Sequence, residues 1–188
     1  MGQNSRFEIR VAGFGGQGIV TIGKILGTAF SVYSNKNSVN TQSYGPESRG
    51  GACRSELIVS NGEINYPYVR EAEVFVALSQ VAYDIYIKDL KEGGILIIDP
   101  EAVEIGNEGD RFQIYQIPVV KIAHAVGNVK CLNAVALGGL SALLSELISK
   151  SALVKALEVS VPSKTVHTNL SAFEMGRKHI KENYSEVN

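Results

Sequence analysis

The stretch FEIRVAGFGGQG, residues 7–18, decides the fold class of this chain. Its first half, Phe7 to Ala12, alternates in polarity and is rich in strand-forming residues, which predicts a β-strand. Gly13 to Gly18 matches the pattern G-x-G-x-x-G and predicts a tight turn. From Ile19 to about Tyr33 the apolar residues keep helical spacing, so the turn joins a strand to a helix.

A glycine-rich turn in this position has two interpretations. Glycines let the backbone come close to a phosphate, and the free N–H groups and the dipole of the helix N-terminus favour an anion. Alternatively, the glycines serve only the close packing of the strand against the helix. The candidate anion-binding residues of this turn are Gly13, Gly15, Gly16, Gln17 and Gly18.

Outward from this unit, strands and helices alternate along the chain. Strands are predicted over residues 39–43, 53–60, 74–79, 95–98 and 112–117, with an Asn61-Gly62 turn after the second of them. One helix is predicted between the strand at 74–79 and Leu90, and Gly93-Gly94 is predicted to end it. Further helices are predicted after Pro118, over 131–149 and over 164–184. The alternation predicts an α/β fold, a single Rossmann-like domain over residues 1–188. It has three layers (α/β/α) and a mostly parallel sheet.

Composition narrows the class of protein. The 188 residues are 45% apolar and 20% charged, as in ordinary globular proteins, and the net charge of −1 offers no general attraction to nucleic acid. The N-terminal stretch MGQNSRFEIR has no apolar signal core, and the longest charge-free run, residues 131–145, falls short of the ~20 residues that cross a bilayer. Two lone cysteines fit a reducing compartment, so we expect a cytoplasmic protein without membrane contact.

The glycine-rich turn lacks a companion that is usual in dinucleotide enzymes. In those enzymes an Asp or Glu about 20 residues further on binds the ribose. Here no acidic residue occurs between Glu8 and Glu47, and Ser43 stands near the expected position. The chain is therefore a poor candidate for NAD, whereas NADP remains open. Gly18 to Lys24 also resembles a P-loop, but Ile25 replaces the magnesium-binding Ser or Thr.

The stretch YGPESRGG, residues 44–51, is predicted to be a loop beside the glycine-rich turn. Residues 9–54 carry five basic side chains and one acidic side chain, although the whole chain is slightly negative. Open α/β sheets bind ligands at the carboxyl edge, where Arg49 would suit a phosphate or a carboxylate. The alternative is an exposed, solvated arginine. The candidate binding residues of this region are Ser43, Tyr44, Arg49, Gly50 and Gly51.

No stretch of the sequence forms a recognisable catalytic or metal site. The histidines at 124, 167 and 179 are scattered, with no i, i+4 pair. Neither a Gly-x-Ser-x-Gly elbow nor a Cys–His pair supports covalent catalysis, and we expect Cys53 to be packed on a strand. Two cysteines are too few for a four-thiolate iron–sulfur cluster. We therefore predict no catalytic and no metal-binding residue in this chain.

Four motifs, taken together and in order, resemble the gamma subunit, or the equivalent fused domain, of 2-oxoacid:ferredoxin oxidoreductases. The motifs are GFGGQG at 13–18, YGPE at 44–47 with RGG at 49–51, Asn133 with Ala136-Leu137-Gly138, and Asn169-Leu170 with Ala172-Phe173 and Gly176. The resemblance extends from about residue 7 to residue 180.

The resemblance implies a place in the CoA-dependent oxidative decarboxylation of a 2-oxoacid (pyruvate, 2-oxoglutarate, ketoisovalerate or indolepyruvate) to an acyl-CoA, with ferredoxin as electron acceptor. In this family thiamine diphosphate and magnesium belong to alpha and beta catalytic subunits. Iron–sulfur clusters also belong to partners, such as a ferredoxin-like delta subunit. The chain agrees, because it has no Gly-Asp-Gly segment followed by an asparagine pair.

The task implied for this hetero-oligomer subunit is to bind or steer coenzyme A and to assemble with its partners. The isolated chain is expected to be inactive and to self-associate. Two alternatives remain open from the sequence. A free-standing NADP- or flavin-dependent reductase would show nucleotide-responsive activity in the isolated chain, and a nucleotide- or metabolite-sensing module would bind a small molecule tightly without large partners.

Overall fold

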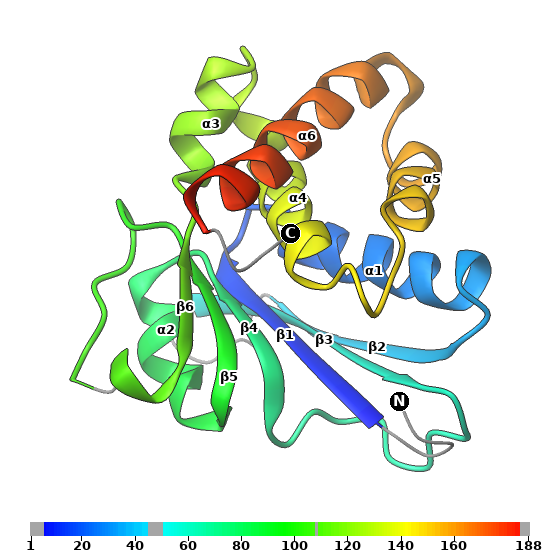
Figure 1. The fold of residues 1–188 in the computed structure, drawn as a ribbon, viewed down its shortest axis with the longest axis vertical. Coiled ribbons are helices and arrows are strands. Elements are labelled where there is room, and N and C mark those ends of the chain that lie inside the picture. Colours follow the sequence, from blue (N-terminus) through cyan, green and yellow to red (C-terminus); the bar gives the residue numbers. More distant parts are fainter. Residues whose placement is uncertain (1–5, 45–50, 108, 185–188) are drawn as a thin grey trace.

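A computed structural model describes residues 6–44, 51–107 and 109–184, which form a twisted sheet between two layers of helices (Figure 1). The strand order is β2-β3-β1-β4-β5-β6. The strands are β1 (Arg6–Phe14), β2 (Asn37–Ser43), β3 (Ala52–Ser60), β4 (Ala72–Ala77), β5 (Leu90–Ile98) and β6 (Gln113–Gln116). Strands β1, β4, β5 and β6 are parallel, and β3 lies antiparallel between β1 and β2. The predicted α/β fold with a mostly parallel sheet is confirmed.

The helices are distributed unequally over the two faces of the sheet. One face carries α2 (Gln80–Tyr86) and the 3-10 turn η3 (Ile87–Asp89). The other face carries α1 (Ile19–Tyr33), α3 (Val119–Ala125), α4 (Leu132–Leu143), α5 (Lys150–Ser160) and α6 (Val166–Asn183), as Figure 1 shows. Three further 3-10 turns are η4 (Gly109–Arg111), η5 (Val129–Cys131) and η6 (Ser163–Thr165).

Helix α4 lies at the centre of the thicker helical layer. It contains no charged side chain, and its residues from Leu132 to Ala142 are all buried. A Cβ at Gly138 would overlap the carbonyl oxygen of Phe173 on α6, and a Cβ at Gly176 would overlap the carbonyl oxygen of Val135 on α4. The backbones of α4 and α6 therefore touch directly, and both glycines are required for that approach.

An ion pair buried on the α2 face fixes the pairing of β1 with β3. Arg10 and Glu56 stand opposite each other in the register, and both are 4% exposed. The Arg10 guanidinium donates to Glu56 Oε1 at 2.8 Å and to Asp89 Oδ2 at 3.1 Å, and it lies over the ring of Tyr86. A buried charge left without its partner is costly, so a shift in this register would be strongly disfavoured.

The sequence predictions and the observed structure differ at three places. Gly93 and Gly94 do not end a helix but lie within β5, where Gly93 adopts a φ of +71° and the pairing with β4 shifts register. The helix predicted over 131–149 ends at Leu143. Helix α5 was not predicted, although Ser149 caps it and its apolar residues recur at helical spacing. Local apolar runs exist at all three places, but pairing and packing with distant segments decide between turn, strand and helix.

No helix within the described ranges is long and apolar enough to cross a membrane.

We expect Gly138→Ala and Gly176→Ala each to lower the free energy of unfolding by about 2–3 kcal/mol, because a methyl group would push apart backbones that cannot relax easily. Gly27→Ala in α1 is the control. Its Cβ would lie 3.6 Å from the nearest atom, so helix propensity should raise stability by up to about 1 kcal/mol. Urea denaturation measures all three, and equal effects at Gly27 and Gly138 would contradict the packing argument.

Candidate binding site

The glycine-rich turn connects the carboxyl end of β1 to the first turn of α1. Gly16 and Gly18 have φ angles of +90° and +73°, which side chains with a Cβ rarely adopt. Gly18 is also the N-cap of α1, and a Cβ there would lie 2.7 Å from the side-chain amide of Asn133 on α4. Gly13 is likewise enclosed, by Leu78 and Ile19. The conformation of the turn thus depends on these glycines whether or not a ligand is bound.

Gln17 holds the turn against the neighbouring strand. Its Oε1 accepts a hydrogen bond from the Phe14 N–H at 2.6 Å, and its Nε2 donates to the carbonyl oxygen of Leu78, just after β4, at 2.9 Å. Both ends of the side-chain amide are therefore engaged within the protein. Gln17 shapes the site rather than offering its amide to a ligand.

A pocket of 480 Å³ opens beside the turn. It is lined by Phe14, Gly15, Gly16, Gly18, Ile19, Val20, Tyr44 and Cys53. The positions of Gly15 and Gly16 face open space, since a Cβ at Gly15 would meet only the Cys53 sulfur, at 3.9 Å, and one at Gly16 would meet nothing within 4 Å. Helix α1 has no side-chain cap and no acidic residue in its first turn. The pocket thus lies at the N-terminal end of this helix, where unpaired backbone N–H groups and the helix dipole favour an anion.

Tyr44 and Gly51, the two ends of the second predicted loop, lie at the same edge of the sheet. Ala52, the first residue of β3, pairs with Phe14, and Gly51 before it has a φ of +80°. Ser43 is the last residue of β2, and Tyr44, which is 61% exposed, lines the pocket. The remaining candidates of this loop, Arg49 and Gly50, lie outside the described residues.

Phe14 and Cys53 line the pocket but were not among the residues predicted for it. Cys53 is half-buried on β3, and Phe14 is 47% exposed at the end of β1. Sequence analysis did not select them because Cys53 belongs to no motif and Phe14 stands at a variable position of the pattern G-x-G-x-x-G. The antiparallel pairing of β3 with β1, which sets Cys53 opposite Gly13, is the signal that places them.

The positive charge of residues 9–54 is not all available to a ligand. Arg10 is buried and paired with Glu56 and Asp89. Arg54 lies 3.7 Å from Glu56 and over the ring of Tyr86. Two of the five basic residues in this segment therefore contribute to the sheet rather than to a ligand site. Backbone N–H groups and the dipole of α1 would supply much of the attraction for an anion here.

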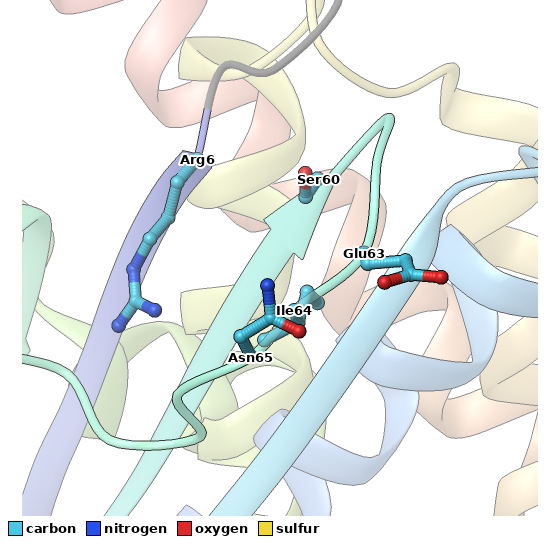
Figure 2. A pocket seen from close by; sticks show the side chains of 5 residues that line it. All are labelled: Arg6, Ser60, Glu63, Ile64 and Asn65. Atoms are coloured by element: carbon cyan, nitrogen blue, oxygen red, sulfur yellow. The ribbon is translucent and has the colours of Figure 1, made fainter.

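A pocket of 420 Å³ at the opposite end of the sheet has a different character (Figure 2). It is lined by Arg6, Ser60, Glu63, Ile64 and Asn65, and Figure 2 shows the Glu63 side chain pointing away from Arg6. The Arg6 guanidinium pairs with Glu8 and donates to the carbonyl oxygens of Tyr66 and Tyr68. Arg6 therefore holds the loop that follows β3 in place, and its guanidinium is already paired within the protein rather than available to a ligand.

The described part of the chain contains no group of three or more His, Cys, Asp or Glu side chains that could hold a metal ion. His179 is hydrogen-bonded to the carbonyl oxygen of Gln116, and His124 and His167 are exposed. Burial raises the pKa of the Cys131 thiol, which keeps this sulfur protonated and weakly reactive at neutral pH.

Comparison with known proteins gives a consistent result along the whole chain. The family model described as pyruvate ferredoxin/flavodoxin oxidoreductase matches residues 8–179. The 2-oxoglutarate synthase subunit KorC of Methanocaldococcus jannaschii is 44% identical over 179 residues, which is 94% of this chain and 95% of that protein. KorC of Methanothermobacter marburgensis is 42% identical and covers 94% of this chain and 98% of its own length.

Solved structures show the same fold. The gamma subunit of a keto/oxoacid ferredoxin oxidoreductase from Geobacter sulfurreducens is 39% identical with a TM-score of 0.80, over 94% of this chain and 99% of that chain. The 2-oxoglutarate:ferredoxin oxidoreductase of Magnetococcus marinus, solved with 2-oxoglutarate, coenzyme A and succinyl-CoA bound, has a TM-score of 0.84 at 26% identity. The match covers 94% of this chain and 31% of that longer chain.

We expect Gln17→Ala to lower the free energy of unfolding by about 1 kcal/mol, because the Phe14 N–H and the Leu78 carbonyl lose their shared partner. Gly15→Ala is the control, since its Cβ would make only an ordinary contact and should change stability by less than about 0.5 kcal/mol. Thermal or urea unfolding compares the two. If Gly15→Ala proved as destabilising as Gln17→Ala, the role given to the Gln17 amide would be wrong.

Proposed function

The chain belongs to the pyruvate ferredoxin/flavodoxin oxidoreductase family as a gamma-type subunit of a 2-oxoacid:ferredoxin oxidoreductase, and we propose that its own task there is to bind coenzyme A and to pack against the catalytic subunits. Its relatives are subunits of oxidoreductase enzymes that work as multi-subunit complexes. A free-standing reductase or sensor, the two alternatives left open by the sequence, has no support from these relatives.

The observation that carries the coenzyme A proposal is the pocket at the uncapped N-terminus of α1. Coenzyme A has a diphosphate group, which would lie against the open backbone of Gly15 and Gly16 and the dipole of the helix. Arg49, which the sequence predicts for the same site, would add a cation to this anion. Aromatic rings of Phe14 and Tyr44 give the pocket an apolar wall for the uncharged parts of the ligand.

When bound, coenzyme A supplies the thiol that accepts the acyl group, and the protein residues named here would bind and orient it. This fits the Magnetococcus marinus enzyme, which contains coenzyme A and succinyl-CoA. The chain has no thiamine-type motif and too few cysteines for a four-thiolate cluster. We therefore assign thiamine diphosphate, magnesium and iron–sulfur clusters to partner subunits of the alpha, beta and delta kinds.

Among the 2-oxoacids, 2-oxoglutarate is the substrate that we propose for the assembled enzyme. The KorC subunits of 2-oxoglutarate synthases are 42–44% identical to this chain in two methanogens. The ketoisovalerate subunit VorA and the indolepyruvate subunit IorB reach 28% and 29%. Ferredoxin is the proposed electron acceptor, and the cytoplasm is the proposed location.

Replacement of Gly15 tests the coenzyme A site. Gly15→Asp would place a negative charge beside the N-terminus of α1, and we expect the KM for coenzyme A in the assembled complex to rise about tenfold, which corresponds to ~1.4 kcal/mol. The KM for the 2-oxoacid should stay unchanged. Gly15→Asn has the same shape without the charge and is the matched control. Unchanged coenzyme A kinetics in Gly15→Asp would contradict binding at this turn.

Native pull-down of the chain from its own cells, with partners identified by mass spectrometry, tests the assembly. We expect thiamine-dependent alpha and beta chains, together with 2-oxoglutarate- and CoA-dependent dye reduction by the purified complex. Variants of the chain that fail to assemble should recover neither the alpha nor the beta chain in the pull-down. Recovery of the chain alone, without such activity, would overturn the proposed role in a complex.

A further inference from the structure

Strand β2 is an edge strand that lacks the usual protection against pairing with another strand. It is the outermost strand of the sheet, and it pairs with β3 through all seven of its residues without a bulge. Among the described strands only β3 pairs with it. Edge strands in natural proteins are commonly short, bulged, charged or interrupted by proline. The sequence of β2, NSVNTQS, contains no charged residue, no proline and no glycine, so its outer side is a regular template for a further strand.

The opposite edge of the sheet is short and is held by the C-terminal part of the chain. Strand β6 has four residues. The Gln116 N–H donates to the Tyr184 hydroxyl at 2.7 Å, and the Gln116 carbonyl oxygen is hydrogen-bonded to Nε2 of His179 at 3.0 Å. His179 lies in α6, and Tyr184 is the C-cap of that helix. A further strand at β6 would have to displace these contacts, so β2 is the edge at which the sheet can be extended.

Side-chain hydrogen bonds hold β2 in place. Ser38 Oγ donates to the carbonyl oxygen of Gly27 in α1 at 3.1 Å. Asn40 Nδ2 donates to the Ser55 hydroxyl at 2.9 Å and to the Glu56 carbonyl oxygen at 3.0 Å, both on β3. A strand that is already ordered loses little conformational entropy when another strand pairs with it. The edge is therefore pre-organised for pairing.

One buried polar atom of β2 has no hydrogen-bond partner. It is the hydroxyl oxygen Oγ1 of Thr41, near the middle of the strand. An unsatisfied buried hydroxyl costs free energy, so a partner for it would stabilise the strand. If two copies of β2 pair antiparallel about Thr41, their Thr41 side chains stand directly opposite each other, with Cβ atoms about 4.5–5.5 Å apart. Rotation about χ1 then lets one hydroxyl donate to the other.

We propose that β2 pairs antiparallel with β2 of a second copy of this chain, about a two-fold axis at Thr41. In this register Val39 faces Ser43 of the second copy, and Asn40 faces Gln42, so amides meet amides and hydroxyls meet hydroxyls. No like charges oppose each other, because the strand has no charged residue. An uncharged edge also offers nothing by which a charged partner of different sequence would be selected, whereas a two-fold contact requires only that the strand complement itself.

The pairing would direct the two pockets beside the glycine-rich turns away from each other. Strands β1 and β2 run in the same direction, because both are antiparallel to β3. In a second copy whose β2 runs the opposite way, the carboxyl edge of the sheet therefore lies at the opposite end. Each copy would then meet catalytic subunits of its own. The inference concerns assembly and does not depend on coenzyme A binding.

Cysteine cross-linking tests the register. A short bis-maleimide should join two copies of the Thr41→Cys chain, in the purified chain and in the assembled complex, to a product of twice the chain mass. Asn37→Cys, exposed on the same strand, is the matched control. In this register its two copies lie about 27 Å apart, at ~3.4 Å per residue, so it should give no such product. The unaltered chain, with Cys53 and Cys131, gives the background.

A charge at the axis tests the contact without cross-linking. Thr41→Lys sets two lysines opposite each other, and we expect the self-association constant from sedimentation equilibrium to fall at least about tenfold. Gln113→Lys adds the same charge to the exposed side of β6 and should leave the constant unchanged. Melting temperatures verify that both variants fold. If Thr41→Lys does not fold, Gln42→Lys, whose side chain is exposed, replaces it.

Three results would overturn the proposal. The first is a purified chain that stays monomeric, together with no cross-link at residue 41 in the complex. The second is self-association that the lysine at the axis leaves unchanged, or cross-linking that is equal at residues 37 and 41. The third is a product that joins Thr41→Cys to a catalytic subunit, which would assign this edge to that subunit instead of a second copy.

Discussion

Direct backbone contact between α4 and α6 positions the helices on the thicker face of the sheet. Gly138 and Gly176 let the two helices meet without side chains between them. Since only the last residue of α4, Leu143, is partly exposed, the helix is fixed within the core, and Asn133 in its first turn is held against Gly18 at the start of α1. The N-terminal ends of α1, α4 and α6 consequently converge, and residues of all three helices line one pocket of 270 Å³.

Some residues of the motif GFGGQG fix the conformation of the turn, and others leave its backbone open to solvent. Gly13 and Gly18 are enclosed by side chains, and Gln17 binds the backbone on both sides of the turn. Gly15 and Gly16 face open space. The two interpretations of the motif, a packing turn and a phosphate site, are therefore compatible, because some of the six residues are enclosed and others face open space.

At this edge of the sheet an anion would be attracted mainly by the ends of helices, whereas the amino-acid composition suggests attraction by basic side chains. Arg10 is used to pair β1 with β3 and is inaccessible to a ligand. The ends of long helices, without acidic residues in their first turns, supply positive potential instead. A backbone source of charge is fixed in space and incurs little side-chain entropy, which would suit the coenzyme A site that we propose for this subunit.

The sequence by itself determined the local units, because periodicity and turn chemistry act over a few residues. Strand β1, the glycine-rich turn and helix α1 lie where the pattern of Phe7 to Tyr33 predicts them, and the ordered motifs identify the family. Only the tertiary structure decided that β3 lies antiparallel between β1 and β2, that Arg10 is buried, and that Asn133 faces Gly18. These contacts join segments far apart in the chain, and their free energy arises from burial and pairing that no local pattern encodes.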